Sequence, residues 1–181
     1  MSLTGLLLAV LALGLAPVGN AAPPKSPPAR AEVERLVRRY YEGIASEPDS
    51  TKSDQVADAI LSENFLFTFG NLPRITQGIP EHKRWLTWHH RADAGQVWSI
   101  QDLMIENGSA ATRFRVEGSH QASLMGVKPT GKPISLRGMD FFRIADGRIV
   151  ELYRVFDGLE LLRQIGVTCP PEAPAGAPRE P

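Results

Sequence analysis

The sequence predicts an α+β fold in which helices come first and a long antiparallel sheet follows. In the first half of the folded part, apolar residues recur at the helical period of 3.6, whereas in the second half polar and apolar residues alternate with a period of 2. Asn-Gly and Asp-Gly pairs separate the alternating segments, as they do in tight hairpins. A strongly curved sheet with helices on its concave face would bury the apolar sides of both.

Three helices are predicted before the sheet. Residues 32–44 place apolar side chains at helical spacing opposite charged ones. Residues 53–61 repeat this pattern over a shorter stretch, and residues 65–69 then form a short strand. The third helix spans residues 80–91, because Pro80 is favoured in a first helical turn.

Four strands are predicted after the third helix, joined by short turns into an antiparallel meander. They span residues 97–105, 111–124, 134–144 and 148–156.

The composition is that of one domain without excess charge. The chain has 181 residues, with 20 Lys and Arg against 20 Asp and Glu, and one Cys. Its length fits a single domain, and the absence of a basic surplus excludes nucleic-acid binding as the main role. One Cys forms no internal disulfide and no Cys-rich zinc site, so an apolar core has to stabilise the fold. We interpret Cys169 as an inert thiol, with an intermolecular disulfide as the alternative.

Both ends are expected to lie outside the folded domain. Residues 1–22 carry no charged side chain and contain an apolar run, Leu6 to Leu15, that is too short to span a bilayer. This pattern is typical of a secretory signal peptide, so we expect a secreted or periplasmic protein. Residues 23–30 form a Pro-rich linker and residues 169–181 a disordered Pro- and Ala-rich tail. The folded domain is predicted to span residues 31–168.

Three polar residues stand out on otherwise apolar strand faces. Alternation puts His120 on the face of Phe114 and Asp140 on the face of Phe142, and Asp157 ends the last strand. Burying an unpaired charge costs several kcal/mol, so each of these groups must be paired, hydrogen-bonded or shifted in pKa. They are therefore either structural polar pairs or parts of a site.

The structural alternatives stay open at this point. His120 is also compatible with a satisfied core histidine, and Asp140 with a partner to Arg137 or Arg143. The third helix holds His82, His89 and His90 at a spacing that is poor for a metal, so we expect no metal site. The segment 126–132 lacks the spacing of a phosphate-binding loop and reads as a hairpin connection.

From residue 113 to residue 167 the sequence resembles the SnoaL-like polyketide cyclase, or ester cyclase, family. The resemblance rests on several motifs that occur in the family's order. They are Gly118-Ser119-His120, the turn Pro129 to Lys132, Phe142-Arg143, the turn Asp146 to Ile149, Glu151 with Tyr153, and Asp157 before Gln164-Ile165-Gly166.

The resemblance implies a nuclear-transport-factor-2-like fold, a cone of curved antiparallel sheet closed by three N-terminal helices around an apolar pocket, in a protein that is usually dimeric. It also implies acid–base catalysis without a cofactor, with Asp140 or Asp157 as the base and His120 as the donor that stabilises an enolate. Aromatic side chains are expected to bind the substrate. They are Tyr41, Trp85, Trp88, Phe142 and Tyr153.

The function that we expect is that of an exported enzyme of the cyclase, aldol or isomerase type, acting as a homodimer on a small apolar molecule with a carbonyl group or a ring. We expect no nucleic-acid partner, and no membrane contact after signal removal. One alternative is a non-catalytic module that binds a small molecule or dimerises, because this fold is also used for ligand carriers and dimerisation domains. Another is epoxide hydrolysis, since residues 153–157 are similar to a strand of limonene epoxide hydrolases that ends in a catalytic Asp.

Overall fold

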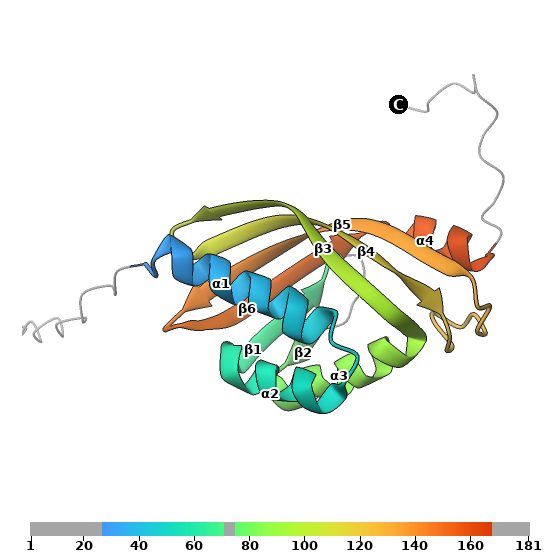
Figure 1. Ribbon diagram of the computed structural model, residues 1–181, viewed down its shortest axis with the longest axis horizontal. Coiled ribbons are helices and arrows are strands. Elements are labelled where there is room, and N and C mark those ends of the chain that lie inside the picture. The colour runs from blue at the N-terminus through green and yellow to red at the C-terminus, as the bar shows by residue number, and fades with distance from the viewer. Residues whose placement is uncertain (1–26, 71–74, 168–181) are drawn as a thin grey trace, which may run out of the picture.

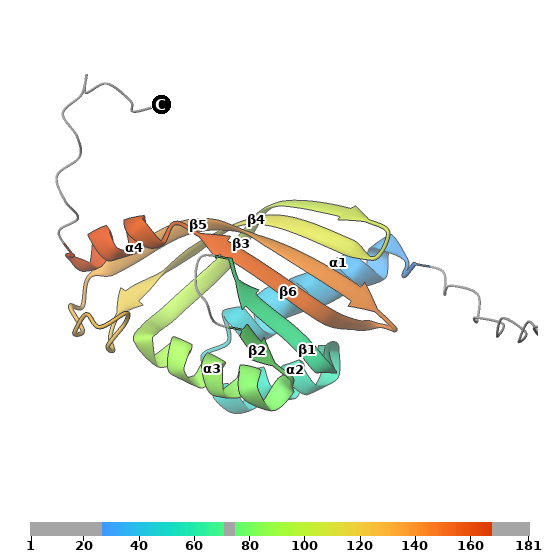
Figure 2. The ribbon, with the colours of Figure 1, turned by 180° about the vertical axis from the view of Figure 1, so that it is seen from behind.

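The computed structural model describes residues 27–70 and 75–167. The predicted signal peptide and C-terminal tail, and the first part of the linker, lie outside the described residues. The fold is α+β, as the sequence predicts: a curved six-stranded sheet, in the order β2-β1-β6-β5-β4-β3, carries α1, α2 and α3 on its concave side (Figure 1). Figure 2 shows β1 and β2 at the edge of the sheet that lies nearest to α2 and α3.

The three predicted helices are present, and a fourth helix follows the last strand at the C-terminal end. The first, α1 (Arg30–Tyr40), runs directly into a single π-helical turn, η1 (Tyr41–Ala45). The second, α2 (Ser50–Ile60), begins where the Asp49 carboxylate accepts hydrogen bonds from two backbone N–H groups of the first turn. Two further helices are α3 (Ile79–Ala92) and α4 (Gly158–Ile165).

The predicted meander is present. It consists of β3 (Asp93–Glu106), β4 (Ser109–His120), β5 (Pro133–Ala145) and β6 (Arg148–Phe156). Two of its turns are Asn-Gly and Asp-Gly pairs in which both residues have positive φ, with 47° at Asn107 and 50° at Asp146, which matches the twist of a tight hairpin. The prediction of a strand as far as residue 124 is wrong, because β4 ends at His120. Beyond it, Leu124 and Val127 form only an isolated bridge around a turn at Met125 and Gly126, where φ is positive.

The sheet continues beyond β6 into the N-terminal half of the chain. There β1 (Leu61–Phe69) pairs with β6 in parallel, and the short edge strand β2 (Ile75–Gln77) pairs with β1 in antiparallel fashion. This parallel pairing joins segments far apart in sequence, and nothing in the local pattern predicts it. In the described part of the chain, no helix combines the length and apolar character needed to cross a membrane.

The core lies between the helices and the inner face of the sheet. In β5 the side chains alternate between exposed and buried, and Leu136, Asp140 and Phe142 all point inward, which confirms the strand face predicted for them. Two hydrogen bonds attach α4 to β5. The side-chain oxygen of Gln164 accepts from the Ser135 N–H group at 2.8 Å, and its NH₂ group donates to the Ser135 carbonyl at 2.9 Å.

One glycine is required by packing at the centre of the sheet. Gly138 on β5 pairs directly with Phe114 on β4. A Cβ atom at position 138 would lie 2.4 Å from the Phe114 ring and 2.3 Å from the Val155 carbonyl oxygen. The missing side chain therefore lets the Phe114 ring lie flat over the strand.

We expect Gly138→Ala to lower the free energy of unfolding by about 1–3 kcal/mol, because the added methyl group overpacks the core. The measurement is urea denaturation. Gln55→Ala, at an exposed position on α2, is the control and is expected to stay within about 0.5 kcal/mol of wild type. Equal losses in both variants would contradict the packing argument.

Candidate active site

An apolar cavity of about 110 Å³, partly open to solvent, lies between α3, the inner face of the sheet and α4. Its wall includes Trp85, Trp88 and His89 from α3, Trp98 from β3 and Phe114 from β4. An engineered apolar cavity of about 150 Å³ is large enough to bind benzene. The cavity therefore has the size for a compact molecule of roughly one ring.

His89 is the only titratable side chain among the described residues that line this cavity. Its ring packs against the indole rings of Trp85 and Trp98, with centroids 4.7 and 6.3 Å away. Its Nδ1 lies 3.0 Å from the amide nitrogen of Gln96, and the amide oxygen of Gln96 accepts a hydrogen bond from the Trp98 indole at 2.6 Å. Burial, followed by the positive charge of Arg154, lowers the pKa of His89 to about 3.

A buried ion pair lies directly behind the cavity wall. Arg154 donates to both oxygens of Asp140, at 2.8 and 2.7 Å, and both side chains are almost completely buried. The hydroxyl of Tyr41 donates to the same carboxylate at 2.6 Å. The guanidinium group of Arg154 also lies 4.1 Å from the ring centroid of Trp98 and 5.2 Å from that of Phe114, and both of these residues line the cavity.

The partner of Asp140 differs from both partners considered in the sequence. Arg137 and Arg143 point to the exposed face of β5, since they have the opposite parity to Asp140. Arg154 lies directly opposite Asp140 in the register of β5 and β6, on the inner face. Burial, and next the Asp140 carboxylate, raise the pKa of Tyr41 above its ordinary value, so this hydroxyl stays protonated and donates.

A second buried histidine lies deeper in the core. His82 stacks on Trp85, with ring centroids 5.7 Å apart, and contacts Phe65 and Phe67 edge-on. Burial, followed by the charge of Arg154, lowers its pKa to about 3, so it is neutral near pH 7. Residues 27–70 and 75–167 contain no group of three or more His, Cys, Asp or Glu side chains arranged to hold a metal ion.

The three residues expected to be catalytic lie in separate places. Asp140 pairs with Thr112 near the start of β4, whereas His120 ends that strand, so the two are not neighbours. His120 is buried, with Nδ1 3.1 Å from the Thr130 hydroxyl and no hydrogen-bond partner for Nε2 among the described residues. Asp157 is exposed and caps α4, where it accepts a hydrogen bond from the Glu160 backbone at 2.9 Å.

The five residues expected to bind substrate are also distributed. Trp85 and Trp88 line the cavity. Tyr41 and Phe142 are buried beside the ion pair, with ring centroids 6.1 Å apart. Tyr153 is 41% exposed on the outer face of the sheet.

Sequence reasoning missed the polar groups that the cavity depends on. The sequence pattern presents His89 only as a poor metal ligand and gives Arg154 no role. The two-residue turn between β5 and β6 would by itself place Asp140 opposite Tyr153. A shift in register between Arg143 and Ile144 brings Arg154 opposite instead, so the local pattern does not identify this partner. No local signal identifies Gln96, because its role depends on the approach of α3 to β3.

Comparisons with known proteins agree with this fold. The family model of the SnoaL-like polyketide cyclase matches residues 34–165. Among solved structures, the chain is similar to TsrD from Streptomyces laurentii, with 22% identity and a TM-score of 0.67 over 77% of this chain and 98% of that one. It is also similar to a protein from Jannaschia sp. CCS1 described as a SnoaL-like polyketide cyclase, with 16% identity and a TM-score of 0.68 over 83% and 100% of the two chains.

A third similar structure is an LEH-like epoxide hydrolase from M. tuberculosis, with 13% identity and a TM-score of 0.58 over 75% of this chain and 90% of that one. Among curated proteins, none matches the sequence. At these identities, the solved structures show a shared fold.

We expect Asp140→Asn to lower the free energy of unfolding by about 3–5 kcal/mol, because it leaves the buried Arg154 charge uncompensated. Denaturant titration measures this loss. Asp102→Asn is the matched control: Asp102 pairs with Arg113, and both side chains are more than half exposed. It is expected to cost less than about 1 kcal/mol. A similar small loss in both variants would show that the buried pair does not depend on its charge.

The two histidines with a pKa of about 3 make stability depend on pH. Between about pH 6.5 and 3 the unfolded chain binds their protons and the folded chain does not, so the free energy of unfolding falls as the pH falls. Each histidine contributes a slope of up to about 1.4 kcal/mol per pH unit. His82→Phe is expected to make the slope shallower by about that amount in denaturant titrations from pH 7 to 4. An unchanged slope would mean that His82 takes up its proton in the folded state.

Proposed function

The chain belongs to the SnoaL-like polyketide cyclase family, and we propose that it is an enzyme that acts on a small apolar molecule held in the cavity beside α3. Its fold is that of small-molecule enzymes, including an LEH-like epoxide hydrolase. The observation that carries the proposal is the neutral imidazole of His89 on an otherwise apolar cavity wall. An uncharged imidazole on an apolar cavity wall is suited to hydrogen bonding with a carbonyl oxygen.

The cavity volume narrows the class of substrate. Sites for drug-sized ligands usually measure about 300–1,000 Å³. The cavity here is about 110 Å³, so the proposed substrate is a compact molecule of roughly one ring. Because the wall is apolar apart from His89, the molecule presents one carbonyl group to His89 and mostly apolar surface to the rest of the wall.

The proposed reaction is proton abstraction next to that carbonyl. His89 donates a hydrogen bond to the carbonyl oxygen and stabilises the negative charge that develops there as the enolate forms. The C–H proton moves to a base, which leaves the enolate. In a cyclisation, the enolate carbon then attacks a second carbonyl carbon of the same molecule. In an isomerisation, the base returns the proton to a different carbon of the enolate system. In the first case a C–C bond forms and the new alkoxide takes the proton from the base, which gives a cyclised aldol product.

We assign the base to His120, which lies outside the cavity wall, so that its imidazole has to approach the substrate for the proton transfer. Its buried Nε2 has no hydrogen-bond partner among the described residues. The strand β4 supplies Phe114 and Val116 to the cavity wall, and His120 lies on the same inner face. Gly118, two residues earlier, pairs with the wall residue Ile134.

The two carboxylates expected from the sequence to be bases take supporting roles in this proposal. Arg154 and Tyr41 occupy both oxygens of Asp140, which therefore anchors the ion pair behind the wall. Asp157 caps α4, which contributes Leu161 to the wall.

Epoxide hydrolysis is the second candidate. The observation in its favour is the buried Asp140–Arg154 pair with Tyr41 as a third donor, on the inner face of neighbouring strands. A carboxylate can activate water while a hydroxyl or guanidinium donor holds the epoxide oxygen. This reaction requires the substrate to pass Trp98 and Phe114, which separate the ion pair from the cavity. In the enolate reaction the donor His89 already lines the cavity, and only the base His120 has to approach from outside the wall.

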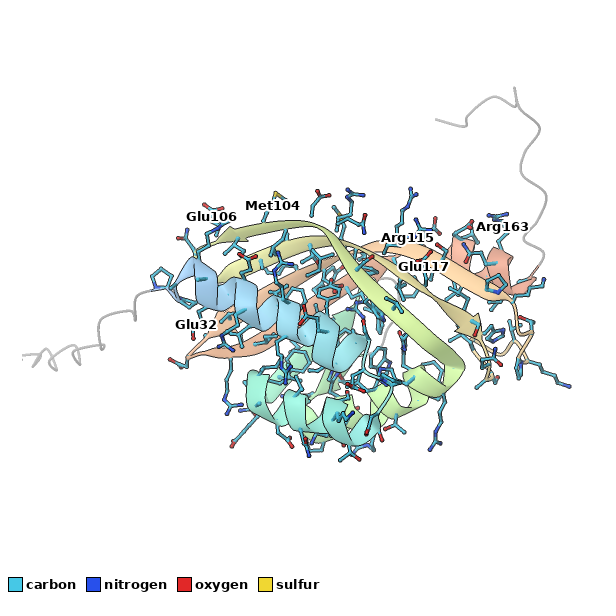
Figure 3. The ribbon with its side chains drawn as sticks, viewed as in Figure 1. Glu32, Met104, Glu106, Arg115, Glu117 and Arg163 are labelled. Atoms are coloured by element: carbon cyan, nitrogen blue, oxygen red, sulfur yellow. The ribbon has the colours of Figure 1, made fainter. Side chains whose placement is uncertain are left out.

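The proposal includes export and a homodimer. Export is supported by the uncharged apolar segment of residues 1–22. The proposed dimer surface is the outer face of the sheet, where four apolar side chains are 40–68% exposed: Met104, Met139, Phe141 and Tyr153. Figure 3 shows Met104 projecting from the side of the sheet that faces away from α1, α2 and α3.

A second copy of the chain is the occupant that this outer face fits. Phe141 lies directly opposite Tyr153 in the register of β5 and β6, so the apolar side chains form a continuous stripe. Around the stripe, Arg143 and Glu151 form an ion pair, as do Arg113 and Asp102. Both signs of charge occur on one face, so two copies related by a twofold axis can match opposite charges.

We expect the wild-type domain to consume one compound from an extract or the spent medium of its source culture, as measured by untargeted mass spectrometry. His89→Phe is expected to lower the rate by roughly 100-fold or more, which is the effect of removing one donor to a developing oxyanion. His90→Gln is the matched control, because His90 follows on the same helix but is not among the described residues that line the cavity.

The mass change of the product separates the candidate functions. An unchanged mass indicates cyclisation or isomerisation, and a gain of one water indicates epoxide hydrolysis. A compound that is retained but unchanged would contradict catalysis and identify a carrier. Equal rates in wild type and His89→Phe would contradict the role of His89.

We expect wild type to elute as a dimer, with Phe141→Glu shifting the molar mass from light scattering towards the monomer, because a buried unpaired charge destabilises the interface. Lys52→Glu, an exposed charge change on α2, is the control and should remain dimeric. Circular dichroism tests that both variants are folded. A monomeric wild type, or a dimeric Phe141→Glu variant, would contradict this interface.

A further inference from the structure

We propose that Gln96 is a positioning residue that fixes the ring proton of His89 on Nε2, and that the Trp98 indole sets the orientation of the Gln96 amide. The inference rests on the proposed function, because it specifies the chemical state in which His89 meets a substrate. It adds two residues, from β3, that have no contact with the reacting atoms in the proposed reaction.

The first step is the orientation of the Gln96 amide. An indole nitrogen is a donor only, so the group that receives the Trp98 N–H must be an acceptor. The Gln96 oxygen lies 2.6 Å from the Trp98 Nε1 atom. The reversed amide would place an NH₂ group against an N–H group at a side chain that is only 6% exposed. The indole therefore directs the oxygen of Gln96 towards itself and the NH₂ group towards His89.

The second step is the proton on His89. An amide nitrogen is also a donor only, and it lies 3.0 Å from Nδ1 of His89. Nδ1 must therefore accept this hydrogen bond, which places the ring proton on Nε2. The opposite tautomer would bring two donors together in a buried site, and the loss of that hydrogen bond corresponds to a preference of about 10-fold or more for the Nε2–H form.

The third step is the direction of the free nitrogen. The His89 ring is held by Trp85 and Trp98, with interplanar angles of 37° and 41°. Among the residues that the structure describes, the side-chain hydrogen bond of His89 is made by Nδ1, and Nε2 is not one of the fully buried unpaired atoms. His89 lines the cavity, so an Nε2–H group is available there for the oxygen of a bound molecule.

The buried Asp140–Arg154 pair holds one member of this chain of hydrogen bonds, Trp98, in place. The Arg154 guanidinium lies 4.1 Å from the centroid of the Trp98 ring, which fixes the indole whose N–H orients Gln96. The same positive charge is, after burial, the largest cause of the low pKa of His89, about 3. Near pH 7 the ring is therefore neutral, and Gln96 decides only which nitrogen holds its single proton.

The test reads the tautomer directly by long-range ¹H–¹⁵N correlation NMR at pH 7 on protein with ¹⁵N-labelled histidine. The chain has 4 histidines, so the signals of His89 are identified by their loss in His89→Phe. In wild type we expect the pattern of the Nε2–H form. In Gln96→Glu, a carboxylate accepts from both Trp98 and His89, so we expect the His89 proton to move to Nδ1 or the ring to become doubly protonated.

Gln101→Glu is the matched control, since Gln101 is an exposed glutamine on the same strand. It is expected to leave the His89 pattern unchanged. Unshifted signals of His82 and His120 in Gln96→Glu show that the variant is folded. An Nδ1–H pattern in wild type, or an Nε2–H pattern that persists in Gln96→Glu, would overturn the inference.

The outcome is separable from that of the proposed function, because the NMR measurement needs no substrate. Wild-type protein that shows the Nε2–H pattern but turns over no compound contradicts the proposed function alone. Once a substrate is identified, Gln96→Glu is expected to lower kcat roughly 10-fold or more with a smaller change in KM, whereas Gln101→Glu changes neither.

Discussion

The rest of the structure depends on one buried ion pair. Two opposite charges persist in an apolar core only when their remaining donors and acceptors are also satisfied. Asp140 meets this condition through two hydrogen bonds from Arg154 and one from Tyr41, and the guanidinium group is flanked by the rings of Trp98 and Phe114. The pair therefore connects β5, β6 and the start of η1, and it holds the wall of the cavity.

The chemistry of the cavity follows from how little polar surface it has. On an apolar wall of low dielectric constant, a single oriented donor has a stronger effect on a developing charge than it has in water. His89 is the only titratable group on the described wall, and burial keeps its ring neutral. Gln96 and Trp98 determine which ring nitrogen of His89 carries the proton. The Trp98 N–H group donates to the Gln96 oxygen, so the Gln96 NH₂ group donates to Nδ1 of His89 and the ring proton lies on Nε2.

The short π-helical turn shows how local irregularity serves this arrangement. Tyr40 and Tyr41 are adjacent, and both are buried. Tyr40 packs edge-on against Phe142, whereas Tyr41 reaches the Asp140 carboxylate from the first position of η1. Such turns are frequent at functional sites. The sequence predicts a continuous helix here, because apolar spacing does not distinguish one wide turn from an ordinary one.

The sequence by itself determined the α+β class, the three N-terminal helices, the meander and the inward direction of His120 and Asp140, because side-chain periodicity and turn residues act locally. It did not determine the parallel pairing of β1 with β6, the partner of Asp140 or the contact of His89 with Gln96. These features join segments far apart in the chain, and their geometry depends on the curvature of the sheet and the docking of α3. Only the tertiary structure decides them, because a hydrogen bond requires its two atoms within about 3 Å, and no local pattern fixes that distance.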